Sequence, residues 1–129
     1  MKILIIGESC LDIFTYGSAD RLCPEAPVPV FKQDNSVTFM GMASNVHRNV
    51  LACLNNLGKK AEVDIKSNQS TGAKVRYIDS NSNQMFLRVD SDEYKEINKL
   101  KLREASVWSY DAVIVSDYNK GYLTDRDLK

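Results

Sequence analysis

The sequence predicts an α/β domain. Two short aliphatic runs, Lys2–Ile6 and Ala112–Val115, have the composition of parallel strands that are buried on both faces. Between them Val46, Val50 and Leu54 recur at the spacing of a helix whose apolar side faces a core. Since strands and helices alternate along the chain, we expect a partial parallel sheet with flanking helices and a small β appendage.

The amino-acid composition excludes several classes of protein. The 129 residues suffice for one domain with a core, and 43% hydrophobic and 26% charged residues are the mix of a soluble protein. Lys+Arg and Asp+Glu both number 17, so the charge gives no reason to expect nucleic acid or a membrane as partner. The three cysteines are widely spaced and follow no secretion signal, so we expect reduced thiols in a cytoplasmic protein.

The first half of the chain is predicted to contain the β appendage. Leu11–Tyr16 is an apolar segment that Gly17 is expected to break. All three prolines lie in Arg21–Pro29, which predicts an extended connection. Two further strands are expected at Val28–Phe31 and Val37–Met40, and a polar turn at Gln33–Ser36 is expected to join them.

A helix and a hairpin follow. The helix is expected to end at Gly58, and Ala61–Ile65 has the composition of a short strand. Lys74–Ile78 and Gln84–Val89 are β-prone runs on either side of Asp79–Asn83, whose polar residues favour a tight turn. The sequence therefore predicts an antiparallel hairpin in this region.

Two more helices are expected towards the C-terminal end. Asp92–Trp108 is moderately amphipathic, and its Trp108 is expected to pack in the core or against the hairpin. Thr124 has the character of a helix N-cap, with Asp125 and Asp127 in the first turn. The last helix is therefore expected to start after Thr124.

Polar residues next to the first strand and the helix are candidates for ligand binding. Asp12 could accept hydrogen bonds from two neighbouring hydroxyls of a polyol, or it could form a turn. At Gly41–Asn45 small residues allow a ligand to approach the backbone, and the Asn45 amide suits a hydroxyl-rich ligand. The alternative is an ordinary helix start that Ser44 or Asn45 caps.

Cations on the hairpin form a second candidate group. Lys74 and Arg76 alternate and so share one face of their strand, and Arg88 lies on the other arm. Together they could hold a phosphate, and Lys120 at the end of the last strand is a further candidate. The alternative is a solvated face that nearby carboxylates neutralise, namely Asp79, Asp90 and Asp92.

Taken together, these segments resemble the ribokinase-like (PfkB) carbohydrate kinases, and among them the heptose 7-phosphate kinase domain of bifunctional enzymes of ADP-heptose synthesis. The PEAPVPV string and the SDYNKG turn are the most specific signals. The matching blocks are Ile3–Asp12, Arg21–Val30, Gly41–Asn45, Lys74–Arg76, Asn83–Asp90 and Ser116–Gly121.

The resemblance implies a fold, a reaction and roles for these residues. Such kinases transfer the γ-phosphoryl group of ATP to a sugar hydroxyl with Mg²⁺, beneath a β lid that often forms a dimer contact. The lid would comprise residues of about 12–40 and 72–90. Asp12, Gly41 and Asn45 would bind sugar hydroxyls. The existing phosphate of the sugar would be held by Lys74, Arg76, Arg88 and Lys120.

The sequence also departs from the family. Met42 stands where the family has a second glycine, and the printed sequence contains neither the GAGD motif, with its catalytic base and anion hole, nor the Asn-x-x-Glu metal motif. We therefore expect residues 1–129 to form one truncated domain that binds a sugar phosphate. ATP and Mg²⁺ would be used only if a second polypeptide supplied the other half of the kinase. The alternatives are an inactive remnant that binds a sugar phosphate or a partner protein, and a reading frame without function.

Overall fold

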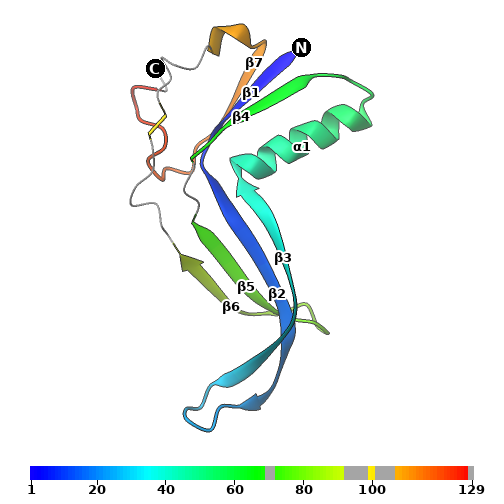
Figure 1. The fold of residues 1–129 in the computed structure, drawn as a ribbon, viewed down its shortest axis with the longest axis vertical. Helices are drawn as coiled ribbons and strands as arrows, with labels where there is room; N and C mark the ends of the chain where they lie inside the picture. The colour runs from blue at the N-terminus through cyan, green and yellow to red at the C-terminus, as the bar shows by residue number, and fades with distance from the viewer. Residues whose placement is uncertain (69–71, 92–98, 101–106, 128–129) are drawn as a thin grey trace. The chain divides into compact units, whose positions relative to one another are not determined.

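The computed structural model describes residues 1–68, 72–91, 99–100 and 107–127. The chain forms two compact units, each built from segments that are distant in the sequence (Figure 1). Unit 1 comprises Met1–Cys10, Met40–Gly72 and Asp92–Lys129, and unit 2 comprises Leu11–Phe39 and Ala73–Ser91.

Unit 1 contains a parallel sheet of three strands in the order β4-β1-β7. The central strand β1 (Lys2–Gly7) pairs with β4 (Glu62–Lys66) on one side and with β7 (Ala112–Ser116) on the other. All three predicted strands of this unit are confirmed, and so is their parallel arrangement. The carboxyl ends of β1, β4 and β7 therefore meet at one edge of the sheet.

The aliphatic side chains of β1 are buried on both faces of the sheet. Leu4 and Ile6 form a core cluster with Tyr122 and Leu123. Ile3 and Ile5 are also buried and, by strand alternation, point to the opposite face. The same face includes Gly7, where an added Cβ would lie 2.0 Å from the Ser116 carbonyl oxygen and 3.2 Å from the Ala43 Cβ.

Helix α1 (Ala43–Asn56) contacts β1 and β4 in unit 1. Its C-terminal end is closed by Gly58, which has a φ of 63°. The Gly58 amide donates to the Asn55 carbonyl at 3.0 Å, and the Lys59 amide to the Leu54 carbonyl at 2.9 Å. This is the pair of bonds that satisfies the last carbonyls when a glycine follows a helix. The predicted helix and its stop are confirmed.

Unit 2 is built on a sheet in the order β3-β2-β5-β6. β2 (Ser9–Leu22) is parallel to β5 (Ala73–Asp79), which is antiparallel to β6 (Met85–Ser91). The predicted hairpin is thus confirmed. Its turn is closed by Asp79, whose carboxylate accepts 2.7 Å bonds from the amide and the hydroxyl of Ser82.

Two predictions for the β appendage are wrong. β2 continues through Gly17, and β3 (Pro29–Met42) is one strand with no turn at residues 33–36. A Cβ on Gly17 would lie 2.1 Å from the Lys32 carbonyl oxygen and 2.7 Å from the Phe31 ring, so glycine here permits close strand pairing rather than a break. The polar residues of β3 are tolerated because this strand lies at the edge of the sheet.

The predictions for the C-terminal part also need correction. Most of the expected helix 92–108 lies outside the described residues, and Val107–Ser109 form a short 3₁₀ helix, η3. Trp108 is 99% exposed, so the prediction that it packs in the core or against the hairpin is wrong. The Asp127 carboxylate accepts hydrogen bonds from the amide and the hydroxyl of Thr124 at 2.8 and 2.6 Å, so Asp127 lies in the first turn after Thr124, as expected. The described residues after Thr124 form a turn, and the rest of the expected helix, residues 128 and 129, lies outside the described residues.

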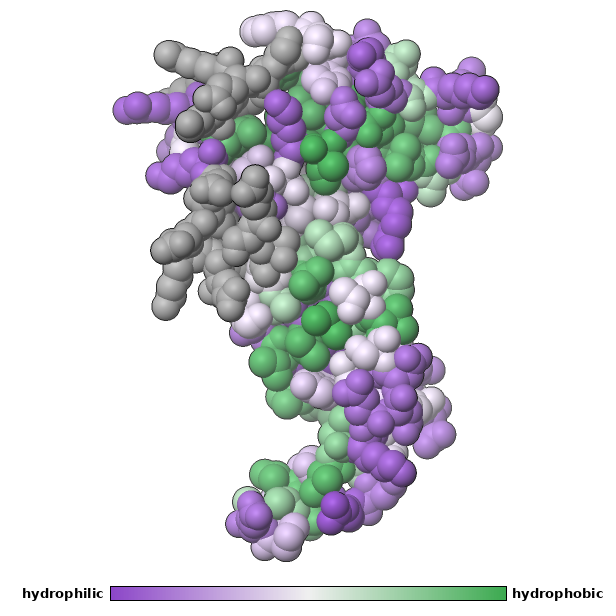
Figure 2. Space-filling view, in the orientation of Figure 1, coloured by the Kyte–Doolittle hydropathy of each residue, from purple (hydrophilic) through white to green (hydrophobic). Residues whose placement is uncertain are grey.

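Unit 2 exposes an apolar surface. Figure 2 shows hydrophobic residues on the outside of this unit. The Phe31 ring packs edge-on against Tyr77 and Phe86, with centroids 5.2 and 5.8 Å apart. Beside them lies a cavity of about 510 Å³, lined by Ala19, Val28, Pro29, Phe31, Tyr77, Phe86, Leu87 and Val89.

None of the helices in the described part of the chain has the length and hydrophobicity to cross a membrane.

Candidate functional site

Strand register gathers the charged candidates of unit 2 on one face of its sheet. Residues that are paired on neighbouring strands point to the same side of a sheet. Lys74 is paired with both its neighbours, Asp12 on β2 and Asp90 on β6. Two positions further along β5, Arg76 is paired with Phe14 and Arg88. The polar face of unit 2, as we call this set, comprises Asp12, Phe14, Lys74, Arg76, Arg88 and Asp90.

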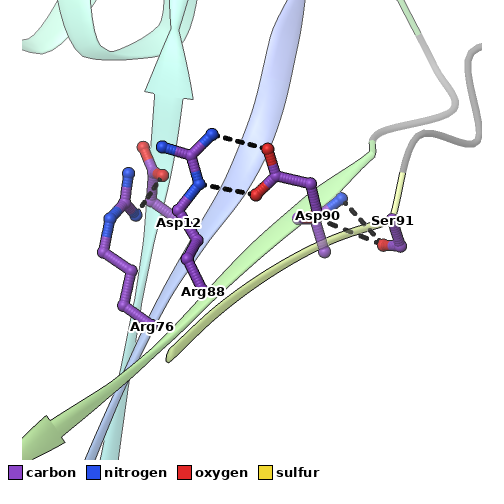
Figure 3. A network of polar contacts seen from close by, with 6 residues as sticks. Asp12, Arg76, Arg88, Asp90 and Ser91 are labelled. Atoms are coloured by element: carbon purple, nitrogen blue, oxygen red, sulfur yellow. Dashed lines mark hydrogen bonds and ion pairs between the residues drawn. The ribbon is translucent and has the colours of Figure 1, made fainter. Parts of the chain in front are cut away.

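Arg76 is bound to Asp12 within this polar face. Its Nη1 donates a 2.7 Å hydrogen bond to Oδ1 of Asp12, and the two side chains are 22% and 24% exposed (Figure 3). The guanidinium carbon also lies 4.9 Å from the centroid of the Phe14 ring, where the ring attracts a cation. Asp12 is therefore held by an arginine within β2, and the interpretation that it forms a turn is wrong.

Arg88 forms a bidentate ion pair with Asp90. Its Nε and Nη2 donate to the two carboxylate oxygens at 2.7 and 2.6 Å (Figure 3). The hydrogen bonds from Arg88 lower the pKa of Asp90, and the nearby charges of Lys74 and Arg76 lower it further. Within the described ranges no ion pair joins Lys74 to a carboxylate. Asp90 and Asp12 therefore partly neutralise the hairpin cations. Neutralisation by carboxylates such as Asp90 is what the interpretation as a solvated face expects.

The structure describes one of the two other expected neutralising groups, Asp79, and it bonds elsewhere. Asp79 is bonded to its own turn, where the Ser82 hydroxyl is the largest cause of its lowered pKa. Asp92 lies outside the described residues.

In unit 1, the start of α1 has an unusual backbone. Met42 is the N-cap residue and has a φ of 54° and a ψ of −128°. This conformation is one that glycine adopts readily and other residues rarely do, which gives a physical reason for the glycine of the resembled family at this position. The helix has no side-chain cap, so the expectation that Ser44 or Asn45 caps it is wrong. The Asn45 Oδ1 instead accepts a 3.1 Å bond from Arg48.

Ser9, Ser44 and Asn68 form a polar cluster in unit 1 that sequence reasoning missed. Ser9 and Asn68 are buried, and their backbone and side-chain groups exchange two hydrogen bonds of 2.6 and 3.2 Å. The Ser9 and Ser44 hydroxyl oxygens are 2.7 Å apart. Asn68 lies just after strand β4, and this position is the signal in the sequence, because polar residues at the carboxyl ends of parallel strands gather at one edge.

Glu8, which follows β1, is bound to the turn after β7. Its side chain is fully buried, and its carboxylate accepts hydrogen bonds from the backbone amides of Tyr118, Lys120 and Tyr122. Burial raises the pKa of the Tyr122 hydroxyl, and the charge of Glu8 raises it further. Lys120 itself is exposed on this turn.

The predicted site residues thus divide between the two units. Unit 2 brings together Asp12, Lys74, Arg76 and Arg88 on its polar face, whereas Gly41, Asn45 and Lys120 belong to unit 1. Among the residues that the structure describes, no three His, Cys, Asp or Glu side chains are grouped in a way that could hold a metal ion.

Comparison with known proteins gives relatives over nearly the whole chain. No protein-family model matches. The bifunctional protein HldE of Caulobacter vibrioides is 36% identical over 148 residues, which cover 95% of this chain and 30% of that protein. The bifunctional protein HldE of Nitratiruptor sp. is 33% identical over 150 residues, with 95% and 32% covered. The chain thus spans about a third of the length of these curated relatives.

Among solved structures, a carbohydrate kinase from Agrobacterium tumefaciens matches with a TM-score of 0.52 and 15% sequence identity. The match covers 88% of this chain and 44% of that kinase. The α/β fold class expected from the sequence is thereby confirmed. The chain is thus similar to the bifunctional HldE proteins over about a third of their length, and it shares its fold with the carbohydrate kinase from Agrobacterium tumefaciens.

Proposed function

We propose that this chain binds a phosphorylated sugar of the heptose 7-phosphate class, as the substrate-binding portion of a PfkB-type carbohydrate kinase. The observation that carries the proposal is the polar face of unit 2, on which two carboxylates and three cations share one side of a sheet. A sugar phosphate presents neighbouring hydroxyls, which donate hydrogen bonds to a carboxylate. It also presents a doubly charged phosphate, which cations bind. The relationship to the HldE proteins supports the same class of ligand.

Each candidate residue has a distinct proposed role in unit 2. Asp12, oriented by Arg76, accepts hydrogen bonds from two neighbouring hydroxyls of the sugar. Lys74 binds the phosphate directly, because no described ion pair engages its ammonium group. Arg88 joins it by exchanging the Asp90 carboxylate for the phosphate, a more highly charged partner for the same two donors.

The resemblance implies further ligands among the residues of unit 1. By that resemblance the Asn45 amide and the Gly41 backbone would bind hydroxyls of a sugar, and Lys120 would bind a phosphate. In unit 2 the β2–β3 and β5–β6 segments serve as the lid, whose closure would exclude water from the transferred phosphoryl group.

Phosphoryl transfer depends on positioning and on neutralisation of charge around the moving group, and ATP with Mg²⁺ supplies that group. The sequence contains neither the GAGD motif nor the Asn-x-x-Glu motif of the resembled family. We therefore propose that a second polypeptide supplies the catalytic base, the anion hole and the ATP site. We place the protein in the cytoplasm, where ATP is available and where its three cysteine thiols would stay reduced.

Calorimetric titration with heptose 7-phosphate tests the binding role. We expect saturable binding by the purified chain, weakened about tenfold or more by Lys74→Ala and by Asp12→Asn, each of which removes a charged hydrogen-bonding partner. Lys32→Ala is the matched control, because Lys32 is an exposed lysine on β3 outside the polar face. Absence of binding by the wild-type chain, or an equal loss with Lys32→Ala, would contradict the proposal.

A coupled assay tests the catalytic part. We expect ATP consumption with heptose 7-phosphate only when the product of the adjacent gene is added to the chain. Activity of the chain alone would show that it contains the groups assigned to the second polypeptide. Binding without activity in any mixture would favour the inactive sugar-phosphate-binding module.

The apolar cavity of unit 2 favours a second candidate, an interaction module that self-associates. Phe86, Leu87 and Val89 are 47%, 56% and 44% exposed beside the cavity, an uncommon density of apolar surface on a small sheet. Sedimentation of the wild type is expected to show a concentration-dependent oligomer, and Leu87→Asp to shift it to the monomer. If the exposed edge strand β7 mediates association instead, Val113→Lys would have that effect and Leu87→Asp would not.

A further inference from the structure

The side chain of Glu8 is 0% exposed, and burial of a carboxylate is costly unless its oxygens accept hydrogen bonds. Three donors meet this need, and all are backbone amides of one turn. Oε2 accepts from Tyr118 at 2.9 Å, and Oε1 accepts from Lys120 at 3.0 Å and from Tyr122 at 3.3 Å. The buried carboxylate is thus bonded to every second residue of the segment that follows β7.

The backbone of this turn is shaped to surround an anion. The residues between the donors have positive φ angles, 54° at Asn119 and 94° at Gly121. Backbone amides that alternate with such residues converge on one side and form an anion-binding concavity, or nest. The Asp117 carboxylate supports the shape by accepting a 2.8 Å bond from the Asn119 amide. The nest is therefore a property of the turn, and Glu8 occupies it.

Strand register explains why Glu8 is the residue that reaches the nest. β1 and β7 are parallel neighbours, with Gly7 paired with Ser116. The residue after Gly7 consequently lies beside the start of the turn. A carboxylate with two methylene groups then extends into the nest from the adjacent strand end.

We propose that Glu8 is a positioning residue, whose carboxylate fills the backbone nest at Tyr118, Lys120 and Tyr122 and thereby fixes the presentation of Lys120 at the carboxyl end of β7. The role of Lys120 as a phosphate ligand rests on the proposed function, whereas the filling of the nest does not. Without the carboxylate, converging amides would repel one another and the turn would lose its single conformation.

The nest is tested by amide NMR without any sugar. Hydrogen bonds to a carboxylate move amide protons downfield, so Glu8→Ala is expected to move the Tyr118, Lys120 and Tyr122 resonances upfield. Added formate, a carboxylate small enough for the space that is left, is expected to restore them, whereas chloride at equal ionic strength is not. Unchanged resonances in the variant, or equal effects of the two anions, would overturn the proposal. Should Glu8→Ala fail to fold, Glu8→Gln keeps the shape of the side chain and is expected to shift the same three resonances.

A double-mutant cycle tests the action through Lys120. Glu8→Gln is expected to weaken binding of heptose 7-phosphate about fivefold to tenfold in the wild-type background, and to have no effect in a Lys120→Ala background. An equal loss in both backgrounds would show a general structural role and overturn the positioning role. If the wild-type chain does not bind this sugar phosphate, the proposed function fails, and the formate experiment still decides whether Glu8 fills the nest.

Discussion

Arg76 donates a 2.7 Å hydrogen bond to the Asp12 carboxylate, although the two residues are 64 positions apart in the sequence. Parallel pairing of β2 with β5 places them on one face, and the Phe14 ring packs against the same guanidinium. Asp12 thus enters any interaction with a ligand already oriented, with one oxygen bonded to an arginine.

This pair is expected to contribute to stability. Arg76→Ala leaves Asp12 partly buried and without this partner, and should lower the free energy of unfolding by about 1–2 kcal/mol in urea denaturation. Arg88→Ala is the matched control, because its ion pair with Asp90 is more exposed and should contribute less. A larger loss from the control would contradict the assignment of Arg76 as the structural member.

Met42 is expected to reverse the usual order of alanine and glycine. In regular structure glycine is less stable than alanine by about 0.5–1 kcal/mol. At the φ of 54° found here, alanine keeps the strain and glycine removes it, so Met42→Gly should be more stable than Met42→Ala by about 1 kcal/mol. Both variants lose the buried methionine side chain, so only their difference in urea midpoint is informative. A more stable alanine variant would show that the backbone there is unstrained.

Gly7 is expected to tolerate no side chain. Because a Cβ would overlap the Ser116 carbonyl oxygen of the paired strand, Gly7→Ala must push β1 and β7 apart, at a cost of about 3 kcal/mol. Gly58→Ala is the control, since nothing lies within 4 Å of its added Cβ and only the positive φ opposes it, at about 1 kcal/mol. Equal thermal stabilities of the two variants would contradict the close approach.

The lowered pKa of Asp90 predicts a pH dependence. A carboxyl group whose folded pKa lies below its unfolded value stabilises the fold above the unfolded value, and this contribution is lost as the pH falls through the folded pKa. Because Arg88 is the main cause, Arg88→Leu should return the pKa of Asp90 towards its ordinary value in an NMR titration. The same variant should leave Asp79 unchanged, whereas Ser82→Ala should raise the pKa of Asp79 alone. Movement of both carboxyl groups in either variant would point to a general loss of structure.

The elements that the sequence predicts well are those whose signal is local. The buried aliphatic run of β1, the spacing of α1 and the polar turn at Asp79–Asn83 each reflect neighbours along the chain. The continuity of β2 through Gly17 depends instead on Phe31 and Lys32, which approach only after the strands have paired. A glycine that breaks a strand and one that permits close pairing look the same in a sequence.

The same distinction holds for the candidate site. Alternation along β5 predicts that Lys74 and Arg76 share a face, and they do. That Arg76 binds Asp12, and that Glu8 binds the turn containing Lys120, depends on strand register, which periodicity does not specify. The sequence thus indicated that Asp90 neutralises hairpin cations, but it did not indicate the partners of Asp12 and Glu8.

The central position of β1 has a consequence for synthesis of the chain. β1 pairs on one side with β4 and on the other with β7, and the Lys2 amide bonds to Asp111, 109 positions later. The pairing with β4 can form once residue 66 has been made, but the other edge of β1 stays open until β7 has left the ribosome, and such distant contacts form slowly. A nascent chain stalled before Ala112 would expose this edge of β1 to chaperones and to aggregation, so synthesis of β7 and full pairing of β1 are coupled events.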